Sequence, residues 1–311
     1  MDRNSVCISL FVFVVSLFLC RLLIMFLKKI RMVQYEREEV MDLQKDKEGT
    51  PRGGGIVFLL LPLFLLPLYS DRDFLFLYLS LLLNGLVGFI DDLLVSRRRQ
   101  AKGLSVRWKI SLQTVISVLL YILIRSSLNF EVHFGKFALL LPEFLYFVLF
   151  VLIYIASSNA FNLTDGVDGL LGSVSIPILL IFALISDGMT ASFALLMIAV
   201  ILAFLWYNSP PASLFMGDTG SGALGGLIAG MSVLTNSELL LPIIAIIPVI
   251  ESLSVFIQVW YFKRTHGKRI FKRAPLHHHF QMLGWSEAKI DFRFFIVTSF
   301  FCVIAFLIQG W

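Results

Sequence analysis

Residues 159–171 read NAFNLTDGVDGLL and separate two long apolar runs. Apolar runs of this length are typical of membrane-spanning helices, so the polar residues between them are expected where a helix meets water. If the stretch continues as helix, Asn162, Asp165 and Asp168 recur every three residues and share one face. The alternative is a short connecting loop of turn residues. The stretch alone favours neither interpretation.

The composition indicates a membrane protein. Hydrophobic residues make up 58% of the 311 residues and charged residues 15%, and the mean hydropathy is +0.86. Soluble domains carry roughly 25% charged residues, so a soluble chain could not bury this much apolar surface. The apolar runs lack the alternation of a membrane barrel. We therefore predict one all-α polytopic integral membrane domain over residues 1–311, with no nucleic-acid partner.

Ten apolar segments are long enough to be membrane helices. The first could be mistaken for a signal peptide, but it is long for one and no small-residue cleavage site follows it. Cys7, Cys20 and Cys302 all lie inside apolar runs, which suggests neither a disulfide frame nor a zinc cluster. The predicted segments are 6–27, 54–69, 74–90, 109–125, 143–158, 170–186, 190–206, 220–235, 240–261 and 292–309.

The distribution of basic residues predicts the orientation. Most of the 26 Lys and Arg residues fall in the three loops after the first, third and ninth helices. These loops share one side if ten helices alternate, and the positive-inside rule makes that side cytoplasmic. Both termini are then outside. The outer loops are short except for residues 126–142, which we expect to form a small hairpin.

The polar clusters fall on the same predicted side as the basic loops. Asp91 and Asp92 end the third helix, residues 159–169 follow the fifth, and residues 207–221 follow the seventh. Three consecutive histidines, residues 277–279, lie in the loop after the ninth. A site assembled from several cytoplasmic loops explains this one-sided distribution.

The acidic residues suit metal or acid-base chemistry. The adjacent carboxylates of Asp91 and Asp92 repel each other unless a cation or a proton is shared, which predicts a Mg²⁺ site or an acid-base pair. A solvated helix end is the alternative. Asp218 lies in FMGDTGS, before a helix rich in small residues. Backbone N–H groups there can meet phosphate while Asp218 holds a divalent ion, and the glycines also favour tight helix packing.

The basic loops suit phosphate. Adjacent residues do not share a helical face, so a zinc site from His277, His278 and His279 alone is disfavoured, and phosphate contact or proton transfer fits better. Residues 45–55, KDKEGTPRGGG, form a glycine-rich basic loop that can wrap phosphates. Taken together, the clusters predict a Mg²⁺-dependent phosphoryl transfer between an anionic nucleotide and a lipid phosphate at the membrane surface.

Four motifs carry a family resemblance: GFIDDLL, SNAFNLTDGVDGL, NSPPASLFMGDTGSGALGG and APLHHHFQMLGWSEAKIDFRF. They resemble the polyprenyl-phosphate N-acetylhexosamine-1-phosphate transferases, over residues 49–295. The acidic motifs are shared across that superfamily, whereas HHHF followed by GW and RF points to its phospho-N-acetylmuramoyl-pentapeptide transferase branch.

The resemblance implies a ten-helix enzyme of the bacterial cytoplasmic membrane, with an outer hairpin and a broken ninth helix. Its reaction would transfer phospho-MurNAc-pentapeptide from UDP-MurNAc-pentapeptide to undecaprenyl phosphate, with Mg²⁺, giving lipid I and UMP. A homodimer is an expectation of the resemblance alone.

The family's motifs imply roles for individual residues. Asp218 matches the Mg²⁺ ligand, Asp91 and Asp92 the catalytic acidic pair, and His277 and His278 the essential histidines. Direct attack by a lipid phosphate that Asp91 has deprotonated is favoured, and a covalent phospho-enzyme stays open. The implied substrate contacts are Asn162, Asp165, Gly166, Val167, Asp168, Asn208, Phe215 and His279, with phosphate contacts at Lys47 and Lys102.

Three departures from the family pattern affect the substrate contacts. Val95 stands where the family usually has Lys, and the neighbouring residues Arg97 to Arg99 are candidates to supply that charge. TPRGGG replaces TPTMGG, and Gln281 stands where Glu is common. Two alternative functions are an N-acetylglucosamine-1-phosphate transferase and a transporter. The HHHF motif argues against the first, and acidic groups at one surface rather than the bilayer midplane argue against the second.

Overall fold

The structure is a computed structural model that describes residues 3–34, 47, 49–65, 71–100 and 103–310. Within these residues every predicted apolar segment falls on a helix, and the segment 240–261 is broken into two. The helices are α1 (Arg3–Lys29), α3 (Ile56–Leu65), α4 (Arg72–Arg98), α5 (Val106–Ile124), α6 (Glu143–Thr164), α7 (Leu170–Ile185), α8 (Gly188–Asn208), α9 (Gly217–Leu234), α10 (Leu241–Ile244), α11 (Ile246–Arg264), α12 (Leu276–Gln281) and α13 (Glu287–Gln309), with a 3-10 turn η2 (Arg125–Ser127) after α5.

Seven of the described helices are long and apolar enough to cross a membrane: α1, α4, α5 with η2, α6, α8, α11 and α13. Helices α3 and α7 are apolar but shorter. The chain is therefore an all-α polytopic membrane protein. The predicted number of ten crossings and the side that faces the cytoplasm stay predictions.

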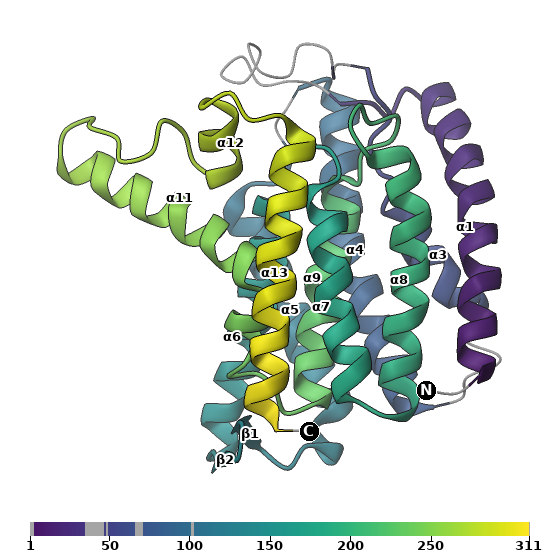
Figure 1. Cartoon of the computed structure of the whole chain (residues 1–311), viewed down its shortest axis with the longest axis vertical. Coiled ribbons are helices and arrows are strands. Elements are labelled where there is room, and N and C mark those ends of the chain that lie inside the picture. The colour runs from purple at the N-terminus through teal and green to yellow at the C-terminus, as the bar shows by residue number, and fades with distance from the viewer. Residues whose placement is uncertain (1–2, 35–46, 48, 66–70, 101–102, 311) are drawn as a thin grey trace.

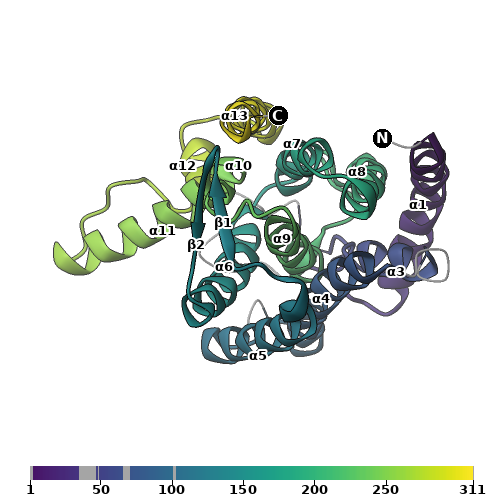
Figure 2. The same cartoon turned by 90° about the horizontal axis from the view of Figure 1, so that it is seen from below.

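Helix α9 occupies the centre of the bundle, with α4, α6, α7 and α8 around it (Figure 2). Its glycines allow this close packing. A Cβ added to Gly226 would lie 2.5 Å from the carbonyl oxygen of Ser80 in α4, and one added to Gly225 would lie 2.6 Å from Cα of Ser158 in α6. Small residues let membrane helices approach at backbone distance. The arrangement fixes the start of α9, where Asp218 lies, against α4.

Helices α4 and α6 run well beyond their predicted ends. Helix α4 continues through Asp91 and Asp92 to Arg98, and α6 continues to Thr164. The prediction ended each helix where its apolar run ended. That was wrong because the polar residues that follow are themselves packed against neighbouring helices, so the helix has no reason to end at the first of them.

The predicted hairpin is present. Strands β1 (Glu131–Phe134) and β2 (Phe137–Leu140) pair antiparallel, with Glu131 opposite Leu140. The hairpin lies at the end of the molecule where α1 begins and α13 ends, opposite the end that carries α12 (Figure 1). These features therefore share one end, as the alternation of helices predicted.

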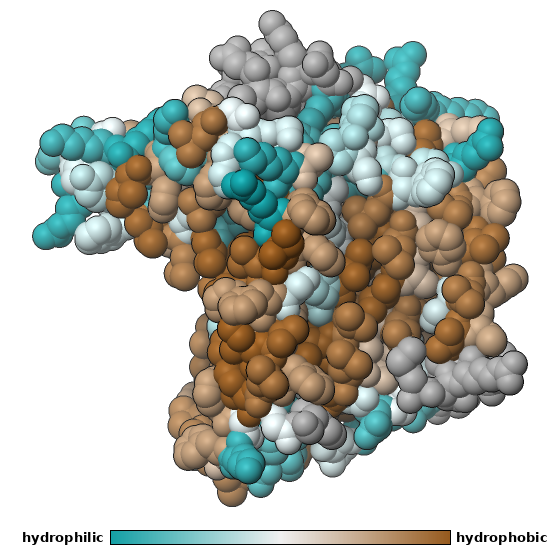
Figure 3. All heavy atoms as spheres, viewed as in Figure 1, coloured by the Kyte–Doolittle hydropathy of each residue, from teal (hydrophilic) through white to brown (hydrophobic). Residues whose placement is uncertain are grey.

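Helix α11 leans away from the bundle, and the chain returns above it to α12 (Figure 1). Its exposed face is apolar, with Phe256 and Trp260 among its largest exposed side chains. Figure 3 shows a broad hydrophobic band across this face of the molecule, including the underside of this arm, with hydrophilic residues at both ends and at the arm's tip. This pattern is that of a protein embedded in a bilayer.

Candidate active site

Asp91 and Asp92 are adjacent but have different partners. Both oxygens of Asp92 are fully engaged at the start of α9: Oδ1 accepts from the Asp218 backbone N–H at 3.0 Å, and Oδ2 accepts from the Thr219 N–H and Oγ1 at 2.9 and 2.6 Å. Among the described residues, Asp91 accepts from the Leu104 N–H, at 2.7 Å to Oδ1. Asp92 therefore fixes the start of α9, whereas Asp91 holds the segment before α5.

Asp218 lies between two cations. Arg52 Nη2 contacts Asp218 Oδ1 at 2.7 Å, and Lys109 Nζ contacts Oδ2 at 2.6 Å. Arg52 also contacts Asp92 Oδ1 through Nε at 2.6 Å. Opposite charges at these distances in a partly buried site stabilise the ionised carboxylates. The same carboxylates hold the pKa of Arg52 above its usual value, against the opposing effect of its burial.

A short backbone pairing places Arg52. The Phe215 N–H donates to the Pro51 carbonyl at 2.8 Å, and the Gly54 N–H donates to the Phe215 carbonyl at 2.8 Å. The glycine is needed, because a Cβ on Gly54 would lie 2.9 Å from that carbonyl oxygen. The first loop is thus joined to the segment before α9. The TPRGGG departure brings a guanidinium to the acidic cluster that the sequence analysis did not single out.

The α6–α7 connection begins one residue after Thr164. Asp165 follows the helix, so Asn162 and Asp165 do not share a continuous helical face with Asp168. Of the two interpretations of this stretch, the structure shows the short connection between helices. Removal of the Asp165 carboxyl from bulk water raises its pKa to about 7, although Arg52 opposes the shift. Asn162 accepts from Lys109 Nζ at 3.4 Å and donates to Ser221 Oγ at 3.0 Å.

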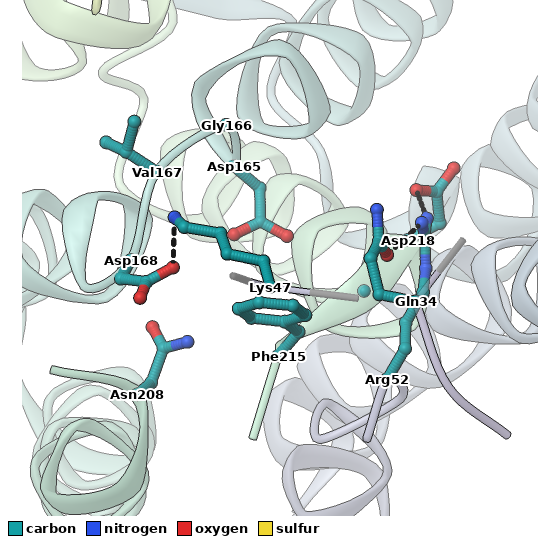
Figure 4. Close-up of a pocket in the computed structure, with 11 residues that line it drawn as sticks. Gln34, Lys47, Arg52, Asp165, Gly166, Val167, Asp168, Asn208, Phe215 and Asp218 are labelled. Atoms are coloured by element: carbon teal, nitrogen blue, oxygen red, sulfur yellow. Dashed lines mark hydrogen bonds and ion pairs between the residues drawn. The ribbon is translucent and has the colours of Figure 1, made fainter. Parts of the chain in front are cut away.

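Lys47 joins three segments at one small cavity (Figure 4). Its Nζ contacts Asp168 Oδ1 at 2.5 Å and Glu287 Oε1 at 2.6 Å, and lies 5.9 Å from the centre of the Phe215 ring. Asn208 lies beside them, but its side chain accepts from the Gly169 N–H and donates to the Leu214 carbonyl, so it orders two loops. The cavity has a volume of about 90 Å³, and Asp165, Gly166, Val167 and Asp218 also line it.

A much larger groove meets this cavity at the acidic cluster. Its volume is about 1140 Å³, and it runs from Asp91 and Asp218 between α6 and α11 to Glu238 near the hairpin end. Apolar side chains make up most of its lining, including Ile153 and Phe256. Asp165, Gly166, Arg52 and Asp218 line both spaces. The groove suits a long apolar molecule whose polar end reaches the acidic cluster.

The three histidines occupy a short helix and have three different surroundings. His277 is 1% exposed, and its backbone N–H donates to Glu251 Oε1 at 3.1 Å. His278 lines the large groove, and its Nδ1 lies 2.8 Å from Gln281 Oε1. His279 accepts from the Lys272 N–H at 3.1 Å and packs beside aromatic rings, away from both spaces. His279 is not among the residues that line either space, and its substrate contact stays a prediction.

His277 packs against the connection between α6 and α7. A Cβ on Gly166 would lie 2.0 Å from His277 Nε2, so the connection passes directly over the ring. His277 Nδ1 lies 3.3 Å from Glu251 Oε2, without hydrogen-bond geometry, and Glu251 is fully buried. His277 and Glu251 therefore position the α6–α7 connection and do not line the small cavity.

The carboxylates suit Mg²⁺ in kind, because that ion prefers oxygen ligands. Among the described residues, however, no set of three His, Cys, Asp or Glu side chains is arranged as a metal site. Both Asp218 oxygens already face a cation. A metal ion at Asp218 would therefore compete with Arg52 and Lys109 for this carboxylate.

Comparisons with known proteins give the family. The model of the family described as Glycosyl transferase family 4 matches residues 74–236. The phospho-N-acetylmuramoyl-pentapeptide-transferase of Dictyoglomus thermophilum is 42% identical over 281 residues, which cover 89% of this chain and 89% of that protein. The protein of the same name from Thermotoga maritima is 41% identical over 307 residues, 96% of this chain and 97% of its own length.

The chain belongs to the phospho-N-acetylmuramoyl-pentapeptide-transferase family. A third relative of that name, from Clostridium acetobutylicum, is 38% identical and covers 92% of this chain and 93% of its own. These bacterial relatives and the seven long apolar helices together show that the chain is a bacterial membrane protein.

Several residues of this transferase were missed from the sequence. Lys109 was assigned to a basic loop and Arg52 to a weak phosphate-binding segment, yet both contact Asp218. Glu287 and Glu251 were not considered, because single acidic residues in or beside apolar runs carry no motif. Arg98 donates to the Gly103 carbonyl and not to the acidic cluster. Lys102 lies outside the described residues.

Proposed function

We propose that this chain transfers phospho-MurNAc-pentapeptide from UDP-MurNAc-pentapeptide to undecaprenyl phosphate, giving lipid I and UMP. The observation that supports this most is the position of Asp218, which lines both the small polar cavity and the long apolar groove. A nucleotide bound across the first and a lipid in the second would meet at the acidic cluster, and the cavity of about 90 Å³ would have to widen to admit the nucleotide.

Asp91 acts as the base. It takes the proton of the lipid phosphate, whose oxygen then forms a bond to the phosphorus that carries the sugar. The bond from that phosphorus to the bridging oxygen breaks, and UMP leaves. Asp92 already accepts four contacts and is therefore a poor nucleophile, which favours direct attack over a phospho-enzyme.

Arg52 and Lys109 stabilise the charge that develops on the phosphates, and Asp218 would hold Mg²⁺. That ion, when bound, supplies further charge neutralisation at the diphosphate. Lys47, Phe215 and Asp168 form the nucleotide end of the small cavity. A uracil ring on Phe215 would share that aromatic face with the Lys47 ammonium.

A basic cavity beside His278 suits the peptide of the substrate. Its volume is about 630 Å³, and Lys263, Arg269, Lys272 and Arg273 line it. No Asp or Glu occurs in residues 252–286. A pentapeptide ends in a carboxylate, which the basic side chains attract. UDP-N-acetylglucosamine, the substrate of the alternative function, has no peptide that could bind in this cavity.

The end of the molecule that carries α12 is assigned to the cytoplasm, with both termini outside. The basic residues of α11 and of the end of α4 lie at that end, in agreement with the positive-inside rule. Gln100 is exposed there, so Gln100→Cys should react with a membrane-impermeant maleimide only when the reagent reaches the cytoplasmic side.

The function is tested with purified protein, undecaprenyl phosphate and Mg²⁺, by measuring UMP release from UDP-MurNAc-pentapeptide and from UDP-N-acetylglucosamine. Release from the first substrate alone is expected. Release from the second alone would move the chain to the other branch of the superfamily. UDP-MurNAc without its peptide should give a higher KM, and Arg269→Gln should remove the difference between the two muramoyl substrates.

A further inference from the structure

A chain of hydrogen bonds links Lys47 to His278 across three segments. Lys47 Nζ contacts Glu287 at 2.6 and 2.8 Å, Gln281 Nε2 donates to Glu287 Oε1 at 3.0 Å, and Gln281 Oε1 lies 2.8 Å from His278 Nδ1. The Asp168 backbone N–H also donates to Glu287, at 3.2 Å. Each group in this chain has a limited choice of donor and acceptor roles.

The donor and acceptor roles in this chain of hydrogen bonds follow one another from the Lys47 end. Lys47 and the Asp168 N–H only donate, so both oxygens of Glu287 accept. Gln281 must then turn its NH₂ group toward Glu287 and its carbonyl oxygen toward His278. Because that oxygen only accepts, His278 Nδ1 must carry the proton. In a neutral ring this leaves Nε2 as an acceptor.

The surroundings of His278 keep the ring neutral. Its burial lowers the pKa to about 3, and the neighbouring His277, Arg273 and Lys47 act in the same direction, while the bond to Gln281 opposes them. The neutral Gln281 amide lies between the Glu287 carboxylate and His278, and that carboxylate is paired with Lys47. Glu251 lies behind His277, on the α11 side.

We propose that Gln281 is a positioning residue that fixes His278 as the Nδ1–H tautomer, so that Nε2 accepts a hydrogen bond from a hydroxyl or amide N–H of the substrate. This role replaces the expectation that His278 contacts phosphate, because the lone pair on Nε2 repels an anionic phosphate oxygen. His278 lines both the large groove and the basic cavity, where the sugar and the peptide would offer such donors. Only the identity of the donor rests on the proposed function.

The test is the ¹⁵N NMR spectrum of histidine-labelled full-length protein in lipid nanodiscs without substrate, with His278 assigned by its loss in His278→Asn. The expected spectrum shows neutral His278 with protonated Nδ1 at neutral pH and no titration down to about pH 5. Protonated Nε2, or an imidazolium at neutral pH, would overturn the proposal. This readout does not depend on the reaction and so stays separate from the proposed function.

Two variants test the role of Gln281 itself. Gln281→Glu places a carboxylate beside Nδ1, and the pKa of His278 should rise by about one to three units. The acid limb of the UMP-release profile should then move to higher pH. Gln281→Met should let the Nε2–H tautomer appear. Gln100→Glu adds the same charge at an exposed site and should change neither readout. A His278 tautomer that is unchanged in folded Gln281→Met would refute the positioning role.

Discussion

At the scale of single residues, we expect Asp91 to act in catalysis and Asp92 to stabilise the start of α9. Asp91→Asn should reduce UMP release by about 10³-fold, because general-base catalysis contributes roughly 10² to 10⁴. Nucleotide binding, measured by calorimetry, should persist. Asp92→Asn should instead lower the unfolding temperature, since it weakens the bonds that hold the start of α9. Normal turnover in Asp91→Asn would exclude Asp91 as the base.

Lys109 and a divalent ion compete for Asp218. Lys109→Met removes one of the two cations at this carboxylate, so Mg²⁺ should bind more tightly, by about tenfold or more. Displacement of bound Mn²⁺, followed by electron paramagnetic resonance, measures the affinity independently of turnover. Lys289→Met is a suitable control, because Lys289 lies over the Trp285 ring, away from Asp218. Equal affinity in both variants would separate Lys109 from the metal site.

At the scale of elements, the turn between α9 and α10 carries a buried carboxyl. Burial raises the pKa of Glu238 to about 7, from a usual value of 4.5, and its Oε2 has no hydrogen-bond partner among the described residues. A raised pKa in the folded state means that its stabilising effect is complete below pH 4.5 and is lost as the pH rises through 7.

The unfolding temperature should therefore fall between about pH 5 and pH 8 in the original chain. Glu238→Gln should weaken this dependence, to which the raised pKa of Asp165 also contributes, and should unfold a few degrees higher at the alkaline end. Asp187→Asn, at an exposed site between α7 and α8, is the matched control. The prediction fails if Glu238→Gln keeps the pH dependence of the original chain.

Gly226 lies at one of the close contacts of α9 with α4. Gly226→Ala places a methyl group 2.5 Å from both the Ser80 carbonyl oxygen and Asn84 Nδ2, and should destabilise the fold by about 1–3 kcal/mol. Gly230→Ala meets its nearest atom, Ser80 Oγ, at 3.0 Å and should cost less. Thermal unfolding in detergent compares the two, and equal losses would show that α4 shifts freely.

At the scale of the whole molecule, the long groove and the small cavity can be tested separately. Ser252 lines the groove from α11, so Ser252→Phe should raise the KM for undecaprenyl phosphate and leave the KM for the nucleotide unchanged. Ile257→Phe adds a ring to an exposed position of the same helix outside the groove lining. A rise in the nucleotide KM with Ser252→Phe would contradict the division of the two substrates.

Much of this architecture could be predicted from the sequence, because apolar runs must become helices in a bilayer. The approximate positions of the helices, the hairpin and the common end of Asp91, Asp165 and Asp218 followed from that constraint. Helix ends could not be predicted, since Asp92 continues α4 where the start of α9 donates to it, and Asp91 where the Leu104 N–H does.

The cations of the site were harder to predict than its carboxylates. Arg52 and Lys109 lie 57 residues apart in the numbering and meet only at Asp218. Many exposed basic residues share their loops, so type and position alone do not distinguish them. The separate surroundings of the three histidines likewise depend on the short helix α12, which a six-residue motif does not reveal.

The outward lean of α11 has a consequence for kinetics. Leu152 and Phe256 line the groove and are more than half exposed, so the groove opens sideways toward the hydrocarbon. An acceptor lipid can then arrive by diffusing in the plane of the membrane, while the nucleotide arrives from water. The rate would follow the surface density of the acceptor, and diluting it with other lipids would slow the enzyme even at a constant bulk concentration.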